Sequence, residues 1–218
     1  NPSDQCDVTF YPKAKLPLAS LPESVTLANG EFSVNIDNLV AHEAGDFTID
    51  FYDDSGAIVF STNPIRIEES PKSRHFWGDI HGQSEETIGT GSAEDYFKFA
   101  RDRAFLDVIG HQGNDFQITT EFWKHLDGLC AKFNQDGTFV TIPGYEWSGN
   151  TGLGGDRNIY FPTEGRTLRR SSHALVSDHS DISTDCNSAT ELFSAFAEND
   201  ESDVVVYAHC GGRYADIE

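Results

Sequence analysis

The pattern of apolar residues changes near residue 70, and this change constrains the fold more than any other feature of the chain. Before it, short runs alternate between apolar and polar residues, as in residues 32–37 and 47–51, and turn residues separate the runs. An alternation with a period of two is typical of strands with one buried face. We therefore expect a small all-β, sandwich-like accessory domain over residues 1–72.

Beyond residue 72 the pattern becomes one of apolar strands followed by amphipathic helices. The strand-like runs end near His81, Gly110, Trp147 and His209. Helical spacing of apolar residues follows three capping positions, which are Ser92, Thr119 or Thr120, and Ser188. Alternating strands and helices favour parallel pairing, with functional residues at the carboxyl ends of the strands. We expect an α/β domain over residues 73–218.

Charge and composition exclude several classes of partner. The chain holds 36 acidic residues against 15 lysines and arginines, a net charge of -21, so nucleic acids and anionic membranes are not expected to bind. No window approaches the roughly 18 unbroken apolar residues of a membrane span. We expect a soluble protein, periplasmic, extracellular or cytoplasmic.

Its four cysteines are widely spaced and lack a C-x-x-C pair, and the sequence leaves their pairing open.

Residues that could bind a metal follow the expected strands. Asp79 and His81 stand two apart and would face one side of a strand end. Residues 111–115, Glu146 and His209 follow later strands. Imidazole and carboxylate groups are the usual ligands of zinc, manganese and iron, so these positions together predict a metal centre. A hydrogen-bonded Asp–His pair is the structural alternative for the first two residues. His111 could equally be a ligand, a general base or a core histidine.

Basic residues are few, and they suggest where an anion could bind. Arg157 lies in a glycine-rich loop after Glu146, and Arg213 follows His209. Residues 166–173 hold the basic cluster of the chain, with Arg169, Arg170 and His173. A solvated loop is one interpretation of this cluster, and a lid that recognises an anionic substrate is the other.

From Phe76 onward the chain resembles the polymerase and histidinol phosphatase (PHP) superfamily of metal-dependent phosphoesterases. The likeness is to a large branch known only as a domain of unknown function, which opens with a segment like residues 76–81. The first family motif, Asp-x-His-x-His, matches Asp79 and His81, whereas Gln83 replaces the second histidine. Later motifs match Leu106-Asp107 with residues 112–115, then Glu146 within residues 143–148, and finally Ala208-His209.

This resemblance implies a distorted β/α barrel with up to three metals, which activate water to attack a phosphoester. Three expected ligand positions hold Gln83, Gly113 and Asn114 instead, so we expect only one or two ions. The last ligand segment of the family would lie beyond Glu218. We therefore expect an incomplete barrel whose activity needs the remainder of its own chain.

Together, these observations predict an incomplete PHP-type β/α barrel after a β domain, acting as a metal-dependent hydrolase on a small anionic ester. The alternative is a non-catalytic carbohydrate- or ligand-binding protein on the same scaffold. The expected metal positions are Asp79, His81, Glu146 and His209, with Asp79 either a ligand or a partner of one. The expected catalytic residues are His111, Asp115, Arg157 and Arg213. The expected substrate contacts are Gln83, Asn114, Arg169, Arg170 and His173.

Overall fold

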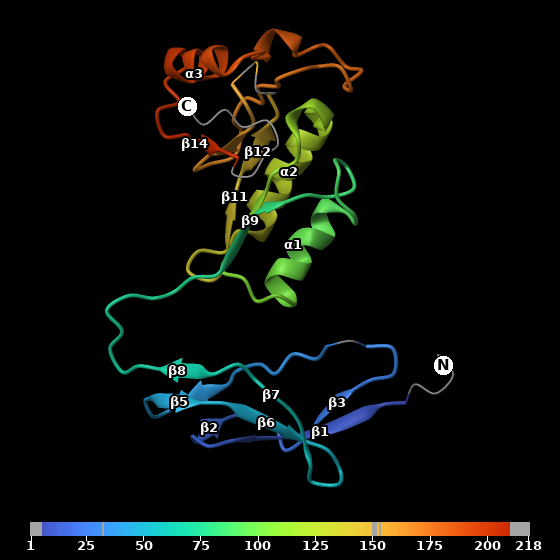
Figure 1. Ribbon diagram of the computed structural model, residues 1–218, viewed down its shortest axis with the longest axis vertical. Helices are drawn as coiled ribbons and strands as arrows, with labels where there is room; N and C mark the ends of the chain where they lie inside the picture. Colours follow the sequence, from blue (N-terminus) through green and yellow to red (C-terminus); the bar gives the residue numbers. More distant parts are fainter. Residues whose placement is uncertain (1–5, 32, 150–151, 153, 210–218) are drawn as a thin grey trace. The chain divides into compact units, whose positions relative to one another are not determined.

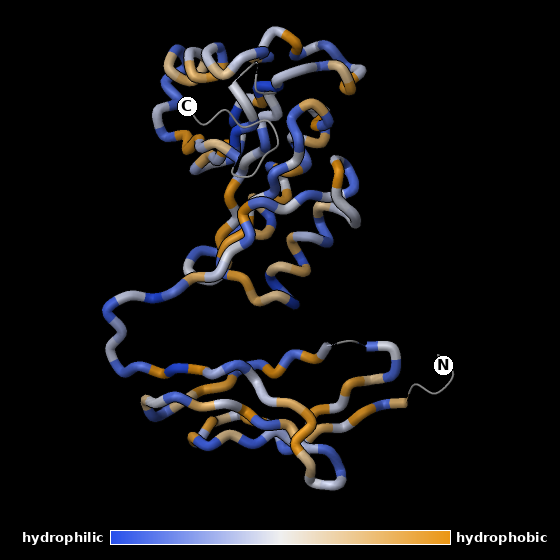
Figure 2. Tube along the Cα trace, viewed as in Figure 1, coloured by the Kyte–Doolittle hydropathy of each residue, from blue (hydrophilic) through white to orange (hydrophobic). Residues whose placement is uncertain are grey.

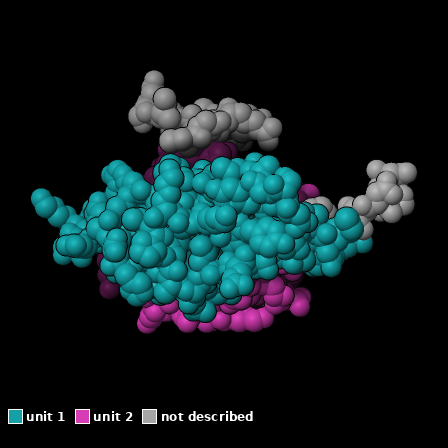
Figure 3. All heavy atoms as spheres, turned by 90° about the horizontal axis from the view of Figure 1, so that it is seen from below, with its two compact units in different colours: residues 1–75 teal, residues 76–218 magenta. Residues whose placement is uncertain are grey.

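A computed structural model describes residues 6–31, 33–149, 152 and 154–209 of the chain. The chain forms two compact units, Asn1–His75 and Phe76–Glu218, which Figure 3 colours teal and magenta. The division lies three residues after the boundary expected between residues 72 and 73. Within the described residues, no helix has both the length and the apolar character needed to cross a membrane.

Unit 1 is built from short strands, and its described part contains no helix (Figure 1). One sheet has the order β3-β1-β6-β7, while β2 pairs with β4 and β5 pairs with β8. The strands are β1 Val8–Ala14, β2 Leu18–Ala19, β3 Val25–Leu27, β4 Val40–Ala41, β5 Gly45–Phe47, β6 Ile49–Tyr52, β7 Ile58–Ser61 and β8 Ile65–Ile67. Alternate side chains of β6 are buried, as the period-two pattern predicts, and the apolar stretches are visible along the trace (Figure 2). The core comprises Val25, Phe47, Ile49 and Phe51.

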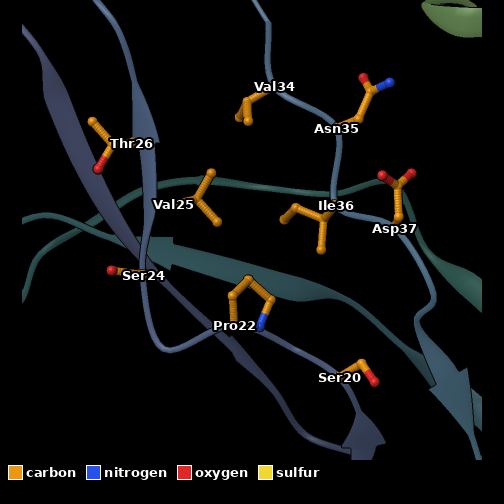
Figure 4. A pocket seen from close by; sticks show the side chains of 9 residues that line it. All are labelled: Ser20, Pro22, Ser24, Val25, Thr26, Val34, Asn35, Ile36 and Asp37. Atoms are coloured by element: carbon orange, nitrogen blue, oxygen red, sulfur yellow. The ribbon is translucent and has the colours of Figure 1, made fainter.

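Unit 1 also has an open depression of about 360 Å³ (Figure 4). Residues 20–26 form one side of it, and residues 34–37 form the other. Its lining contains Val25, Val34 and Ile36 together with small polar side chains and a single carboxylate, Asp37. Among the described residues, no aromatic ring lines the depression.

Unit 2 is a mixed α/β unit with two separate three-stranded sheets (Figure 1). The first, in the order β11-β10-β9, is parallel, and the second, β12-β13-β14, is antiparallel. The strands are β9 Gly78–Gly82, β10 Val108–His111, β11 Val140–Ile142, β12 Gly144–Trp147, β13 Arg157–Tyr160 and β14 Val205–Ala208. The helices are α1 Ala93–Asp102, α2 Thr120–Phe133 and α3 Ala189–Glu198, and short 3-10 turns cover Asp115–Gln117 and Ile182–Thr184. Aromatic and aliphatic residues of both sheets and all three helices share one core.

The three helices begin where the capping signals predict. The hydroxyls of Ser92, Thr119 and Ser188 accept hydrogen bonds from the backbone N–H three residues on, at 3.1, 3.0 and 3.2 Å. Each bond satisfies an amide that has no partner inside its helix. The predicted helix starts are therefore confirmed, with Thr119 rather than Thr120 as the second cap.

The expected β/α barrel is wrong. The described part of unit 2 has three short helices and two small sheets, and no closed barrel joins them. Pro143 supplies a physical reason, because it divides the apolar run of residues 139–147 into β11 and β12, which enter different sheets. Proline has no N–H to donate and interrupts a ladder. After β12 the chain returns directly as antiparallel β13, without the helical crossover that a barrel requires.

Candidate metal centre

Three potential metal ligands converge in unit 2 from three different strands. His81 lies on β9, Glu146 on β12 and His209 directly after β14. His81 Nε2 lies 3.1 Å from His209 Nε2 and 3.5 Å from Glu146 Oε2. One ligand atom from each residue lies within 4.8 Å of the other two. We call His81, Glu146 and His209 the triad.

The two sheets that carry the triad are connected beside it. The Tyr160 hydroxyl donates to the Ile80 carbonyl at 2.7 Å, and this bond joins β13 to the residue before His81. That bond uses the only proton of Tyr160, so the 2.9 Å contact with Tyr207 has the Tyr207 hydroxyl as its donor. Burial is the largest of the effects that raise the pKa of Tyr160 far above its usual value. This phenol stays protonated and fixes β9 against β13.

A second connection joins the strand that carries Glu146 to the end of β10. The Glu146 N–H donates to the Gly113 carbonyl at 2.9 Å, and Asn114 forms a parallel bridge with Glu146. The side chain of Glu146 is 7% exposed, whereas that of His81 is 37% exposed. The triad is therefore closed on its carboxylate side and open to solvent at His81.

The geometry of the triad suits a cation. An imidazole nitrogen that carries no proton has a lone pair, so two such nitrogens at 3.1 Å repel each other unless a proton or a metal ion lies between them. A tetrahedral ion with bonds of about 2.0–2.1 Å separates its ligand atoms by about 3.3–3.4 Å. Two of the three separations, 3.1 and 3.5 Å, lie on either side of that value, and the third is at most 4.8 Å. Two imidazoles and a carboxylate are ligands that divalent transition metals prefer, and the spacing around His81 suits such an ion.

Asp79 lies beside the triad without belonging to it. Its Oδ1 accepts a hydrogen bond from the His81 N–H at 3.0 Å, so the carboxylate is directed at the backbone of a ligand residue. This bond is the hydrogen-bonded Asp–His pair that was the structural alternative for these two residues, and a role of Asp79 beside a metal stays a prediction.

Gln83 and Asn114 lie next to Glu146 and bond to each other. Thr87 Oγ1 donates to Gln83 Oε1 at 2.8 Å, and Gln83 Nε2 donates to Asn114 Oδ1 at 3.1 Å. Asn114 Nδ2 then donates to Ser148 Oγ at 3.0 Å. We call this chain of four side chains the amide ladder. It occupies the polar groups that were expected to contact substrate.

The backbone at Gly113 leaves no room for a side chain. A Cβ there would lie 2.8 Å from Thr87 Cγ2 and 2.9 Å from His111 Cε1, both closer than packed atoms approach. The carboxylate that the family motif places at this position would therefore displace the amide ladder or the His111 ring. This explains, from local packing, why residue 113 carries no ligand.

His111 is a buried core histidine. Its Nδ1 accepts a hydrogen bond from the Gly113 N–H at 3.2 Å, so the proton resides on Nε2, which is 2.9 Å from Ser84 Oγ. Burial lowers the pKa of the ring to about 4, with a smaller opposing contribution from Glu86. Both ring nitrogens form hydrogen bonds inside the protein. Of the three roles expected for His111, which were ligand, general base and core histidine, these bonds match the core histidine.

Asp115 is fully buried and binds backbone amides. Its two oxygens accept hydrogen bonds from the N–H groups of Ser148, at 2.9 Å, and Ser171. Burial raises the pKa of the carboxyl group to about 6 against the lowering effect of these bonds. The side chain holds the segment after β12 against residues 170–172, and it is not brought to the triad.

The basic residues expected to bind substrate are engaged elsewhere. Arg170 is fully buried and donates to the Ile118 carbonyl and to Asp181, at 2.8 and 2.9 Å. Arg169 pairs with Glu201 at 2.8 Å, and His173 Nδ1 lies 2.6 Å from Asp185. These bonds fix residues 166–186 to the body of unit 2. The structure thus places Arg169 and Arg170 in internal ion pairs, and His173 in contact with Asp185, rather than at an anion-binding lid.

Arg157 is not brought to the triad either. Arg157 pairs across strands with Trp147 and Ala208, whereas Glu146 pairs with the next residue, Asn158. Neighbouring residues of a strand point to opposite faces, so Arg157 and Glu146 start on opposite faces of the sheet. Arg213 lies outside the described residues.

Strand β13, Arg157–Tyr160, begins within residues 149–158, where the sequence predicts a glycine-rich loop. This strand places Asn158 and Tyr160 on the same face as Glu146. The signal was present, because Asn158 and Tyr160 alternate with the buried Ile159 and Phe161. The preceding glycines concealed it.

The described cysteines are all free. Cys130 and Cys186 are buried, and Cys6 is exposed. Cys210 lies outside the described residues.

Comparison with known proteins finds relatives of unknown function. An uncharacterised protein of Chlamydia pneumoniae is 27% identical over 142 residues, which is 64% of this chain and 23% of that protein. Uncharacterised proteins of Chlamydia trachomatis and Chlamydia muridarum are 27% and 24% identical over 116 residues, which is 52% of this chain and 19% of each. The chain thus spans about a fifth of the length of these relatives. No family model matches the chain, and no solved structure matches it.

Proposed function

We propose that unit 2 is a metal-dependent hydrolase with one divalent transition metal held by His81, Glu146 and His209. The observation that carries the proposal is the separation of the ligand atoms, 3.1 Å between the two Nε2 atoms and 3.5 Å from His81 Nε2 to Glu146 Oε2. Three residues from separate strands supply two nitrogens and one oxygen, a donor set typical of zinc, manganese or iron.

The chemistry follows from a site with few protein ligands. A divalent ion held by three side chains keeps open positions, where it lowers the pKa of a water molecule and polarises the bond to be cleaved. The 37% exposure of the His81 side chain leaves solvent and substrate a path to this position. Glu146, buried on the opposite side, supplies negative charge that favours binding of the cation.

The resemblance to the PHP superfamily supports a phosphoester as the substrate. This substrate is a proposal, and it rests on the sequence motifs. The arginines that would have favoured an anionic substrate give no further support, because Arg169 and Arg170 are held in internal ion pairs. We therefore keep the reaction class, hydrolysis assisted by a metal, and rest the phosphoester on the resemblance alone.

The alternative is a non-catalytic ligand-binding protein, and the amide ladder favours it. Gln83 and Asn114 hold two positions where the resemblance expects metal ligands, and they satisfy each other's polar groups instead. A site that has lost part of its ligand set can lose turnover and keep binding. Turnover itself distinguishes the two functions.

The test combines metal content with turnover. The longest native form of the protein is purified without chelator, its metals are measured by elemental analysis, and its activity is assayed on phosphomonoesters, phosphodiesters and carboxylic esters. We expect about one transition metal per chain and hydrolysis of at least one substrate class. The variants His81→Ala and Glu146→Gln should lose both properties, whereas His42→Ala, at an exposed position of unit 1, should keep both. Bound metal without turnover on any panel member would favour the binding protein, and absence of metal would reject the proposal.

A further inference from the structure

Asn158 lies on the middle strand of the sheet that carries Glu146 and leads into His209. It lies on the middle strand β13 and pairs with Glu146 of β12 on one side and Tyr207 of β14 on the other. Directly paired residues of antiparallel strands project to the same face, with Cβ atoms about 5 Å apart. His209 lies two residues after Tyr207, and its N–H continues the pairing by donating to the Asp156 carbonyl at 3.1 Å. Asn158 and His209 are therefore diagonal neighbours on one face.

Two polar atoms at this place have no hydrogen-bond partner among the described residues. Asn158 is 3% exposed, and its Oδ1 is buried without a partner. The Nδ1 of His209 is buried without a partner as well. Buried polar atoms are rarely left unpaired, and asparagine is disfavoured in strands, so the pair requires an explanation. One atom accepts a hydrogen bond and the other, when protonated, donates one.

The other donors nearby are already engaged. The Tyr207 hydroxyl gives its proton to Tyr160, which gives its own to the Ile80 carbonyl. Gln112 Nε2 donates to the carbonyls of Ile159 and His111, at 3.0 and 3.3 Å, which uses both of its protons. Among these neighbours, His209 Nδ1–H is the remaining group that can donate a hydrogen bond to Asn158 Oδ1.

We propose that Asn158 is a positioning residue that accepts a hydrogen bond from His209 Nδ1–H and so holds His209 Nε2 toward His81 and Glu146. Diagonal neighbours on a sheet have Cβ atoms about 7–8 Å apart, a span that an asparagine and a histidine side chain bridge together. A proton fixed on Nδ1 leaves the lone pair of Nε2 for the metal, which is how partners of metal-bound histidines select the ring form. This inference rests on the proposed metal centre.

The experiment measures metal affinity and the proton itself. Zn²⁺ is titrated into the wild type, Asn158→Leu, Asn158→Asp and Asn29→Leu, the last a control at an exposed position of unit 1. Leucine keeps the size of the side chain without an acceptor, so Asn158→Leu should bind Zn²⁺ about 10–100-fold more weakly. Aspartate keeps the acceptor, so Asn158→Asp should bind at least as tightly as the wild type. Asn29→Leu should bind unchanged.

Nuclear magnetic resonance of the Zn²⁺-loaded wild type gives a readout that does not depend on any variant folding. We expect a slowly exchanging imidazole Nδ1–H signal that through-bond correlation assigns to His209, and its loss in Asn158→Leu. If His209 carries its proton on Nε2, or if Asn158→Leu binds Zn²⁺ within twofold of the wild type, the inference is wrong while the metal centre stands. If the wild type binds no Zn²⁺, the metal centre itself is rejected, and this inference with it.

Discussion

At the scale of single residues, the proposed metal centre depends on two histidines whose Nε2 atoms lie close together. The Nε2 atoms of His81 and His209 are 3.1 Å apart, with Glu146 Oε2 at 3.5 Å from the first. Without a cation or a proton between them, this approach is unfavourable. Either a proton or the cation of the proposed metal centre removes this repulsion.

We expect His81→Ala and His209→Ala each to weaken Zn²⁺ or Mn²⁺ binding at least about 100-fold. Loss of a direct ligand should cost no less than loss of a residue that merely orients one, which costs 10–100-fold. Isothermal titration calorimetry measures the effect, with His125→Ala, an exposed residue of α2, as the matched control. Wild-type affinity in either triad variant would remove that histidine from the site.

The buried His111 ring makes stability depend on pH in a defined direction. Burial lowers the pKa of this group from 6.5 to about 4, so between these values the unfolded chain binds a proton that the folded chain does not. The stabilising contribution is present above pH 6.5 and is lost as the pH falls toward 4. The wild type should thus lose about 3 kcal/mol relative to His111→Gln over this range.

Denaturant unfolding of both proteins from pH 7.5 to pH 4 measures this difference. Asp115, whose pKa burial raises from 3.8 to about 6, has the opposite slope over much of the same range. It is present in both proteins, so its contribution cancels in the comparison. A difference that does not change with pH would mean that His111 titrates normally in the folded protein.

At the scale of elements, the basic segment of residues 166–186 is an anchor rather than a lid. Arg170 reaches the Ile118 carbonyl and Asp181, and Cys186 returns its N–H to the Arg170 carbonyl at 2.8 Å. The segment thus forms a loop closed on itself and fixed to the start of α2.

Replacement of Arg170 by methionine should lower the free energy of unfolding by about 3 kcal/mol, because it removes the guanidinium that pairs with Asp181 and leaves the Ile118 carbonyl without its donor. Metal affinity should stay within about threefold of the wild type, since Arg170 is engaged away from the triad. Chemical denaturation and a Zn²⁺ titration test both statements, with Lys124→Met, at an exposed position of α2, as the control. Unchanged stability together with lost activity would restore Arg170 to a role in substrate binding.

Elements with local signals could be predicted from the sequence. The three helices start at hydroxyl caps, and strands form at the positions expected for His81 and Glu146 and directly before His209. The expected barrel was wrong because the pairing of strands depends on partners that are distant in sequence. The division at Pro143 sends β11 and β12 to different sheets, and β13 returns antiparallel, so the barrel did not follow from correct local elements.

The candidate site shows the same limit. The triad residues could be expected from ligand types at strand ends. In contrast, the burial of Arg170 and His111 could not, because a basic or polar residue in a loop or at a strand end has the same local pattern whether it faces solvent or an internal partner. Only the packed structure supplies the partners that decide between the two.

At the scale of the whole molecule, the site belongs to one unit. His81, Glu146, Asn158 and His209 all lie within residues 76–218, and each unit has a core of its own. We therefore expect residues 76–218 alone to bind Zn²⁺ within about fivefold of residues 1–218. Calorimetry on both forms measures this, and binding confined to the longer form would assign unit 1 a part in the site.

The most direct test of the account is anomalous scattering from crystals grown without chelator and soaked with Zn²⁺ or Mn²⁺. We predict one strong peak per chain, about 2.0–2.2 Å from the Nε2 atoms of His81 and His209 and from a carboxylate oxygen of Glu146. Gln83 and Asn114 should face this peak without binding it. An empty triad at saturating metal, or a peak bound elsewhere in the chain, would contradict the account.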